Sequence, residues 1–341
     1  MNKSLICLVT NMNMNKDFEE YLLKLVSINE VELYRIIKYQ LGWEDEGGNK
    51  IENLNPENRK FSNLTLNIAE LFGSNFQNSF PFAASVEILA SSWYVHGDVQ
   101  SGITDRFGRP SVWWKWGPAQ SINTGDGLHA LARLSLLKNN NLSNETLLKA
   151  LSIFDNSYLM LCEGENLDIN FQESPLVKVD QLIDMMKKRP GSLYGCCYQL
   201  GYLAANNEID EDILNSLNNI GIISGLIDEL EEQNSILHDQ NLSPEIFHRF
   251  ASKKKNIFTS FLLEESDPSV KRKIGEIYLK RVLEESDLKT IKETVFENKQ
   301  YLNFYEDLIS SHTENLDKLI NNLSSEKEIK SRLKNLSYNE S

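Results

Sequence analysis

The chain has 341 residues, of which 41% are hydrophobic and 25% are charged, and its formal net charge is −14. It contains no run of about 18 consecutive apolar residues, so a transmembrane span is not expected. The acidity argues against a nucleic-acid partner, because binding to a phosphate backbone needs a basic face. A small diphosphate needs only a local group of cations or a metal, and it is therefore not excluded.

We expect no signal peptide, because the apolar run within MNKSLICLVTN is short and has no small-residue cleavage site. The four cysteines have no metal-like spacing, and Cys196 and Cys197 fall within a helical pattern. These features predict a reducing, cytoplasmic location. The composition along the chain predicts a poorly ordered N-terminus over residues 1–19, one helical domain over residues 20–323, and a polar, frayed tail over residues 324–341.

Helical periodicity recurs along the chain, whereas the alternation typical of strands is almost absent. The segment from about Pro81 to Val95 is apolar on nearly every side, as in a helix buried among others. A later helix ends at Pro190-Gly191, because proline and glycine interrupt helices. The next helix has apolar residues at the spacing i, i+3, i+4, i+7, namely Leu193, Cys196, Cys197, Leu200, Leu203 and Ala204.

Two dipeptides, Ser243-Pro244 and Asp267-Pro268, each place a capping side chain before a proline at the first helical position. Near the C-terminus the helical spacing returns in Leu316, Leu319, Ile320 and Leu323. We therefore predict an all-α fold.

The most informative segment runs from Phe80 to Leu137. An apolar stretch there ends at His96-Gly97-Asp98, and a polar turn with Arg106 and Gly108-Arg109-Pro110 follows. A second apolar stretch then begins at Asn123-Thr124-Gly125-Asp126. This layout resembles the trans-type polyprenyl (isoprenyl) diphosphate synthase family, and the resemblance extends over about residues 34–260. It implies an isoprenoid synthase-type bundle of long antiparallel helices around a central apolar cavity, usually as a homodimer.

The resemblance also implies Mg²⁺ as cofactor, held against a prenyl diphosphate by two acidic clusters on facing helices. The first cluster, Asp-Asp-x-x-Asp in the family, reads Gly97-Asp98-Val99-Gln100-Ser101 here. Only Asp98 keeps a carboxylate, so it is the expected metal ligand and catalytic residue on this helix, with His96 before it at the substrate. The alternative is that Asp98 is a solvated residue at a helix end.

The second cluster corresponds to Asp228, Glu229 and Glu232, the expected metal ligands of the other wall. Asp228 and Glu232 are four residues apart and so share one face of a helix. The glutamine that precedes this cluster in the family is replaced by Gly225. Without the resemblance, such a cluster is typical of an exposed helix face.

Between the clusters, the resemblance assigns catalytic roles to Asp168 and Arg189, the latter in place of a lysine that contacts the diphosphate. It assigns Lys255, in the basic run Ser252–Asn256, to a segment that closes over the diphosphate. The alternatives are a basic helix end near Arg189, which would stabilise the helix dipole, and a solvated face around Lys255.

The second substrate of the family is isopentenyl diphosphate, held by a Gly-Gly-Lys-Arg-x-Arg-Pro segment. Here only Arg59 matches its cations, since the lysine becomes Asn58 and the second arginine Phe61. The family's paired arginines after the first cluster are reduced to Arg106. A diphosphate needs several cationic contacts to offset its desolvation, so ordinary chain elongation is not expected.

We therefore predict a polyprenyl synthase-family protein that binds a prenyl diphosphate and transfers or cyclises its prenyl group with a reduced Mg²⁺ site. The alternative is a catalytically silent homologue that acts as a regulatory or structural subunit of an active synthase. The partner is accordingly a second copy of the chain or an active synthase.

Overall fold

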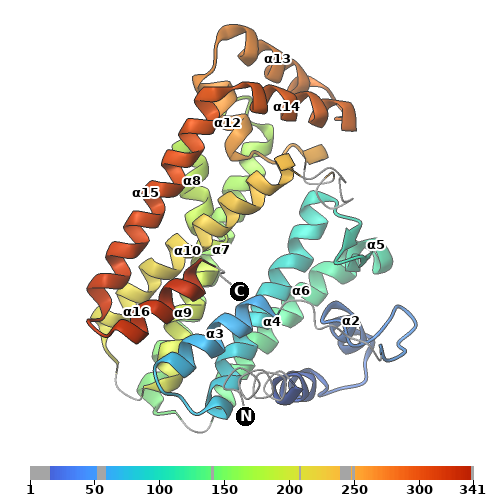
Figure 1. Ribbon diagram of the computed structural model, residues 1–341. Helices are drawn as coiled ribbons and strands as arrows, with labels where there is room; N and C mark the ends of the chain where they lie inside the picture. The colour runs from blue at the N-terminus through green and yellow to red at the C-terminus, as the bar shows by residue number, and fades with distance from the viewer. Residues whose placement is uncertain are drawn as a thin grey trace, which may run out of the picture.

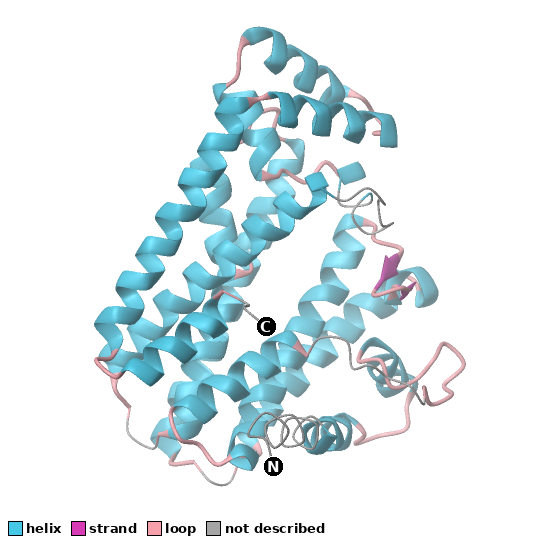
Figure 2. Cartoon of the chain, viewed as in Figure 1, coloured by secondary structure: helices cyan, strands magenta, loops and turns pink. Residues whose placement is uncertain are grey.

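The computed structural model describes residues 16–51, 59–139, 142–206, 209–238, 247 and 250–338. Over these residues the chain is almost entirely helical, which confirms the predicted all-α class (Figures 1 and 2). The only strands within the described ranges are β1 (Asp105–Arg106) and β2 (Arg109–Pro110), which pair as a hairpin. None of the described helices is both long enough and apolar enough to span a membrane.

A helical stretch over residues 16–26 precedes the labelled elements. In chain order the helices that follow are α2 (Glu32–Gln40), α3 (Lys60–Leu71), α4 (Phe76–Ser101), α5 (Val112–Trp116), α6 (Pro118–Leu137), α7 (Asn144–Glu173), α8 (Val179–Lys188), α9 (Gly191–Ala205), α10 (Glu211–His238), α12 (Ile257–Glu265), α13 (Pro268–Leu279), α14 (Glu285–Glu297), α15 (Lys299–Leu323) and α16 (Lys327–Ser337). The long helices form the body of the molecule, and α12, α13 and α14 lie together at one end (Figure 1).

Helix α4 lies at the centre of the bundle and packs against α3, α6 and α9. It is buried on nearly every side, as predicted for residues 81–95. Its N-terminus is capped by the side chain of Asn75, and Gly102 ends it with a φ of 65°. The helix therefore continues through Gly97 and Asp98 to Ser101, so the helical geometry sets which face of α4 each of these residues occupies.

Helices α9 and α10 approach each other closely because glycines face each other across the contact. A Cβ atom on Gly221 would lie 2.6 Å from the Cα atom of Gly195, and one on Gly225 would lie 2.7 Å from the ring of Tyr194. Gly225 thus leaves the space that the aromatic ring occupies. As a result, Tyr194 lies against α10 one turn before Asp228.

The remaining sequence expectations concern two helix starts and the two ends of the chain. Asp267 lies at the N-cap of α13, but its side chain makes no capping hydrogen bond. Ser243-Pro244 and residues 1–15 lie outside the described residues. Helix α16 occupies much of the segment expected to be a polar tail, with Leu333 fully buried and Ser337 hydrogen-bonded to Tyr198 at 2.7 Å. The helical part of the chain therefore continues past residue 323.

Candidate functional site

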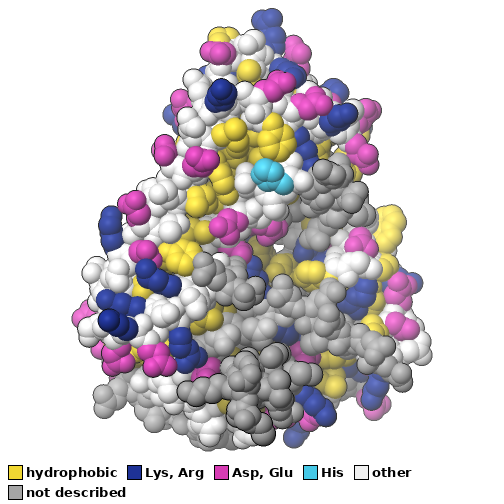
Figure 3. Space-filling view, in the orientation of Figure 1, with side chains coloured by type: hydrophobic (Ala, Val, Ile, Leu, Met, Phe, Trp, Pro, Cys, Tyr) yellow, Lys and Arg dark blue, Asp and Glu magenta, His cyan; other side chains and the backbone are white. Residues whose placement is uncertain are grey.

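A cleft of about 240 Å³ opens between α4, α9 and α10, beside the β1–β2 hairpin. The face drawn in Figure 3 is hollowed near its middle, where Figure 1 shows α4 and α10 opposite each other. Acidic, basic and aromatic side chains share the lining. They are Lys60, Phe61, Trp93, Tyr94, Arg106, Phe107, Glu165, Arg189, Tyr194, Asp228, Glu229, Glu232 and Lys254, together with Gly97, Ile103 and Pro190.

The α10 wall carries the three acidic residues predicted for the second cluster, and all three line the cleft. Asp228 is bound by Lys60, the first residue of α3, with 2.6 Å between Nζ and Oδ2. The same ammonium lies 5.3 Å from the centre of the Tyr194 ring. Burial and the nearby Asp228 carboxylate raise the pKa of Tyr194 well above its usual value. Glu229 accepts a hydrogen bond from Gln233 at 2.8 Å.

The α4 wall presents Trp93, Tyr94 and Gly97 to the cleft, but not Asp98. Asp98 is only 1% exposed, and its Oδ1 accepts from Nε of Arg106 at 2.7 Å and lies 2.6 Å from Nη2. Arg106 reaches it because the hairpin folds back through a two-residue turn. Phe107 and Gly108 have φ values of 53° and 73° there, as in a type I′ turn.

The third group of charges lies where α7 meets the start of α9. Nη1 of Arg189 is 3.0 Å from Glu165 and its Nη2 is 3.6 Å from Asp168, while Lys254 approaches Asp168 at 2.8 Å. Burial disfavours the charged form of Arg189, but Asp168, Glu165 and Glu229 together raise its pKa. Burial, followed by the repulsion from Arg189, lowers the pKa of Lys254. The structure thus brings Asp168 and Arg189 together.

Two predicted substrate contacts lie away from the cleft lining. Lys255 places its ammonium 4.7 Å from the centre of the Tyr278 ring, and the adjacent Lys254 lines the cleft in its place. The predicted contact of Lys255 is therefore made by its neighbour, in a segment outside the helices. His96 packs on Gly125, 3.3 Å from the carbonyl oxygen of Ile122, and lies between α4 and α6.

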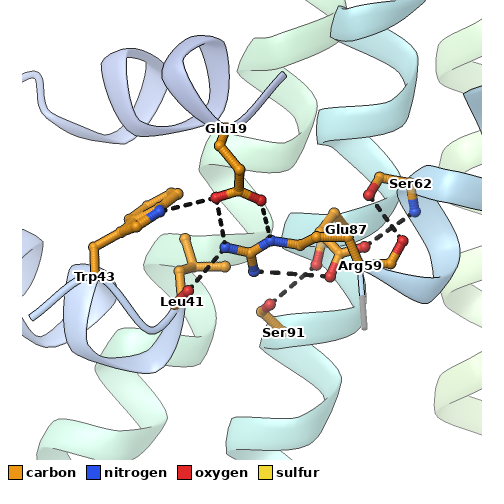
Figure 4. A network of polar contacts seen from close by, with 7 residues as sticks. All are labelled: Glu19, Leu41, Trp43, Arg59, Ser62, Glu87 and Ser91. Carbon is orange, nitrogen blue, oxygen red and sulfur yellow. Dashed lines mark hydrogen bonds and ion pairs between the residues drawn. The ribbon is translucent and has the colours of Figure 1, made fainter. Parts of the chain in front are cut away.

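Arg59 also lies outside the cleft lining and belongs to a buried polar network (Figure 4). It donates to both carboxylate oxygens of Glu19, at 2.7 and 3.1 Å, and to the carbonyl oxygen of Leu41 at 2.8 Å. Oε1 of Glu87, on α4, lies 4.0 Å from Nη1 of Arg59. The indole N–H of Trp43 donates to Glu19. The network joins the helix over residues 16–26 to α3 and α4, so Arg59 holds these segments together.

A family model described as polyprenyl synthetase matches residues 57–295, which is more than half of the chain. The chain belongs to the polyprenyl synthetase family. It is 28% identical over 274 residues to the geranylgeranyl diphosphate synthase of Saccharolobus solfataricus, covering 77% of this chain and 80% of that protein. It is 34% identical over 155 residues to the geranylgeranyl diphosphate synthase of Mycobacterium tuberculosis, covering 45% and 43% of the two chains.

The structure superposes on the polyprenyl synthetase of Streptomyces coelicolor with a TM-score of 0.82 at 20% identity, over 96% of this chain and 97% of that one. This likeness confirms the predicted isoprenoid synthase-type fold. The relatives are prenyl diphosphate synthases by name.

The Mg²⁺ implied by the polyprenyl synthetase family does not fit the side chains as they are arranged here. A hard cation needs several convergent oxygen ligands. Within the described ranges, no group of three or more His, Cys, Asp or Glu side chains is arranged to hold a metal. Asp98 faces Arg106, and Asp228 faces Lys60. Gly97 has no side chain to offer as a ligand. A Cβ atom at Gly97 would meet nothing within 4 Å, so the position has room for a side chain.

Several cleft residues were not predicted as site residues from the sequence: Lys60, Trp93, Tyr94, Phe107, Glu165, Tyr194 and Lys254. Lys60 was missed because it occupies the variable position of the family's basic segment, next to the matching Arg59. A signal for Tyr194 was present in Gly225, since the loss of a long side chain on α10 leaves room for a large one on α9.

The network around Arg59 generates a stability prediction. Arg59→Ala would leave Glu19 and Glu87 without their shared cation, and removing one partner of a buried ion pair costs about 3–5 kcal/mol. We expect a loss of that size in the free energy of unfolding, measured by urea denaturation. The control is Arg35→Ala, which removes an exposed pair with Glu32 and should change stability by less than about 1 kcal/mol. Equal effects of the two substitutions would contradict the structural role of Arg59.

Proposed function

We propose that this polyprenyl synthetase-family protein binds a prenyl diphosphate in the cleft and does not elongate it by head-to-tail condensation. The observation that carries the proposal is the position of Arg59. It is the one cation retained from the family's acceptor segment. Its Nε and Nη2 donate to Glu19 and to the Leu41 carbonyl, and its Nη1 lies 4.0 Å from Glu87.

Binding of a prenyl diphosphate is supported by two kinds of side chain that face the same cleft. Arg189 and Lys254 line the cleft beside the start of α9, where both approach Asp168 and Arg189 also contacts Glu165. The N-terminus of a helix also favours anions. The rings of Trp93 and Tyr94 stack with their centres 5.3 Å apart, and they offer an apolar surface to a prenyl chain. The cleft thus matches a ligand with one anionic and one apolar end.

Elongation would need a second diphosphate beside the first, and the described residues offer little charge for it. Arg106 is the other cation expected at the acceptor, and it is engaged with buried Asp98. Releasing it toward a ligand would leave a carboxylate buried without its partner, which is strongly unfavourable. The loss of acceptor binding therefore follows from the same contacts that stabilise the fold.

Among non-elongating roles, the geometry favours a regulatory or structural subunit of an active synthase over prenyl transfer or cyclisation. Transfer and cyclisation both require ionisation of the diphosphate, and three of the carboxylates expected to serve this step, Asp98, Asp168 and Asp228, are paired with the chain's own cations. The exposed apolar residues of α6 and α7 support association with another chain of the same fold. They are Ile122, Leu134, Leu137, Leu148 and Leu159.

The first test is a prenyl-transfer assay with farnesyl or geranylgeranyl diphosphate, labelled isopentenyl diphosphate and Mg²⁺. We expect no elongated product, because the acceptor cations are engaged, while the donor diphosphate should raise the melting temperature of the protein. An active synthase of the family, assayed in parallel, is the positive control. Formation of a longer prenyl diphosphate would contradict the proposal, and release of pyrophosphate from the donor alone would favour transfer or cyclisation.

The second test addresses the partner. When the protein is co-expressed with a synthase of the same organism that has both complete aspartate clusters, we expect the two chains to co-purify and the product length to change. Leu148→Asp with Leu159→Asp should weaken this association, because both leucines are more than half exposed on α7. Leu279→Asp, at the exposed C-terminal end of α13, is the control, because Leu279 is even more exposed than the two leucines of α7. A protein that ignores the synthase would contradict the subunit role.

A further inference from the structure

We propose that Lys60 takes the place of a divalent metal in this cleft, while Arg106 neutralises Asp98 on the opposite wall, so that prenyl diphosphate binding is independent of Mg²⁺. The inference rests on the proposed function, since it concerns how the same ligand is held. It identifies Lys60 as the specificity-determining residue, at a position where the family pattern fixes no side chain.

The Lys60 ammonium is held at the cleft by a carboxylate and an aromatic ring. It lies 2.6 Å from Oδ2 of Asp228, lines the cleft, and is held beside the Tyr194 ring. Its side chain is 30% exposed and that of Asp228 is 18% exposed, so the pair is partly withdrawn from solvent. A metal ion at the same carboxylate oxygen would have to displace this ammonium or lie against it, and the two like charges would repel.

The opposite wall of the cleft carries a second pair of an aspartate and a cation. Arg106 neutralises Asp98 from the hairpin, while its guanidinium lies 4.8 Å from the centre of the Tyr94 ring. Each of the two aspartates retained from the family's acidic clusters therefore has a cation of the chain beside it. Lys60 comes from α3 and Arg106 from β1, and both cations line the same cleft.

Lys60 has the donors to bind two anions at once. An ammonium has three N–H donors, and one of them suffices for Asp228. The others can donate to a diphosphate that enters the cleft, so Lys60 would bridge the carboxylate and the ligand as a bound metal does. Arg189 and Lys254 provide further cations on the same cleft. Binding then needs no added metal.

The experiment measures the affinity for farnesyl thiolodiphosphate, a slowly ionising analogue, by calorimetry in EDTA and in millimolar Mg²⁺. We expect the wild-type Kd to agree within about threefold between the two conditions. Lys60→Met should weaken binding in EDTA by about tenfold or more, since a charge-assisted hydrogen bond is lost. Mg²⁺ should partly restore binding to this variant, because Asp228 then lacks its ammonium.

Lys60→Arg should keep metal-independent binding, and Lys115→Met, which removes an exposed pair with Glu46, should leave the Kd unchanged. Circular dichroism checks that each variant folds. Wild-type binding that appears only with Mg²⁺ would overturn the inference and leave the proposed function standing, and so would a Lys60→Met variant that binds in EDTA as tightly as the wild type. Absence of binding in both conditions would overturn the proposed function as well.

Discussion

Carboxylates that face the interior of a helical bundle need a positive partner, because a poorly polarisable interior stabilises an isolated charge badly. In this chain the partners of Asp98 and Asp228 are Arg106 and Lys60. The third retained carboxylate, Asp168, lies between Arg189 and Lys254. These three aspartates are thus neutralised by the chain's own cations, and the affinity of the cleft for metals and anions depends on these pairs.

The fold explains why these cations reach their partners. The type I′ turn at Phe107 and Gly108 folds Arg106 back over the end of α4, and Gly225 lets Tyr194 lie beside α10 under the Lys60 ammonium. Arg59 is held one residue earlier, by Glu19. The chain therefore keeps the fold of the family, and within that fold Arg106 and Lys60 are placed beside Asp98 and Asp228.

The sequence predicted the parts of this structure that depend on periodicity and spacing. The buried central helix follows from its apolar residues, and the shared face of Asp228 and Glu232 follows from their separation of four residues. The family resemblance assigned both Asp168 and Arg189 to the site, and the structure brings them together. Each of these predictions depends on local helical geometry or on the resemblance to the family.

Other parts depend on the direction of single side chains, which a sequence does not fix. Arg59 and Lys60 are adjacent, but the helix start turns successive side chains by about 100°, so one is buried in a network and the other enters the cleft. Lys254 and Lys255 also diverge, since Lys254 lines the cleft and Lys255 lies against the Tyr278 ring. Asp98 was expected to face the ligand, but it faces the hairpin because Gly97 holds the cleft-facing position on α4.

The central claim is that the retained aspartates are satisfied by the chain's own cations and do not bind divalent metal. A titration of the protein with Mn²⁺, followed by electron paramagnetic resonance of the free ion, tests it directly. The account predicts no site tighter than millimolar in the wild-type protein. One or more tight sites that disappear on Asp228→Asn would contradict it.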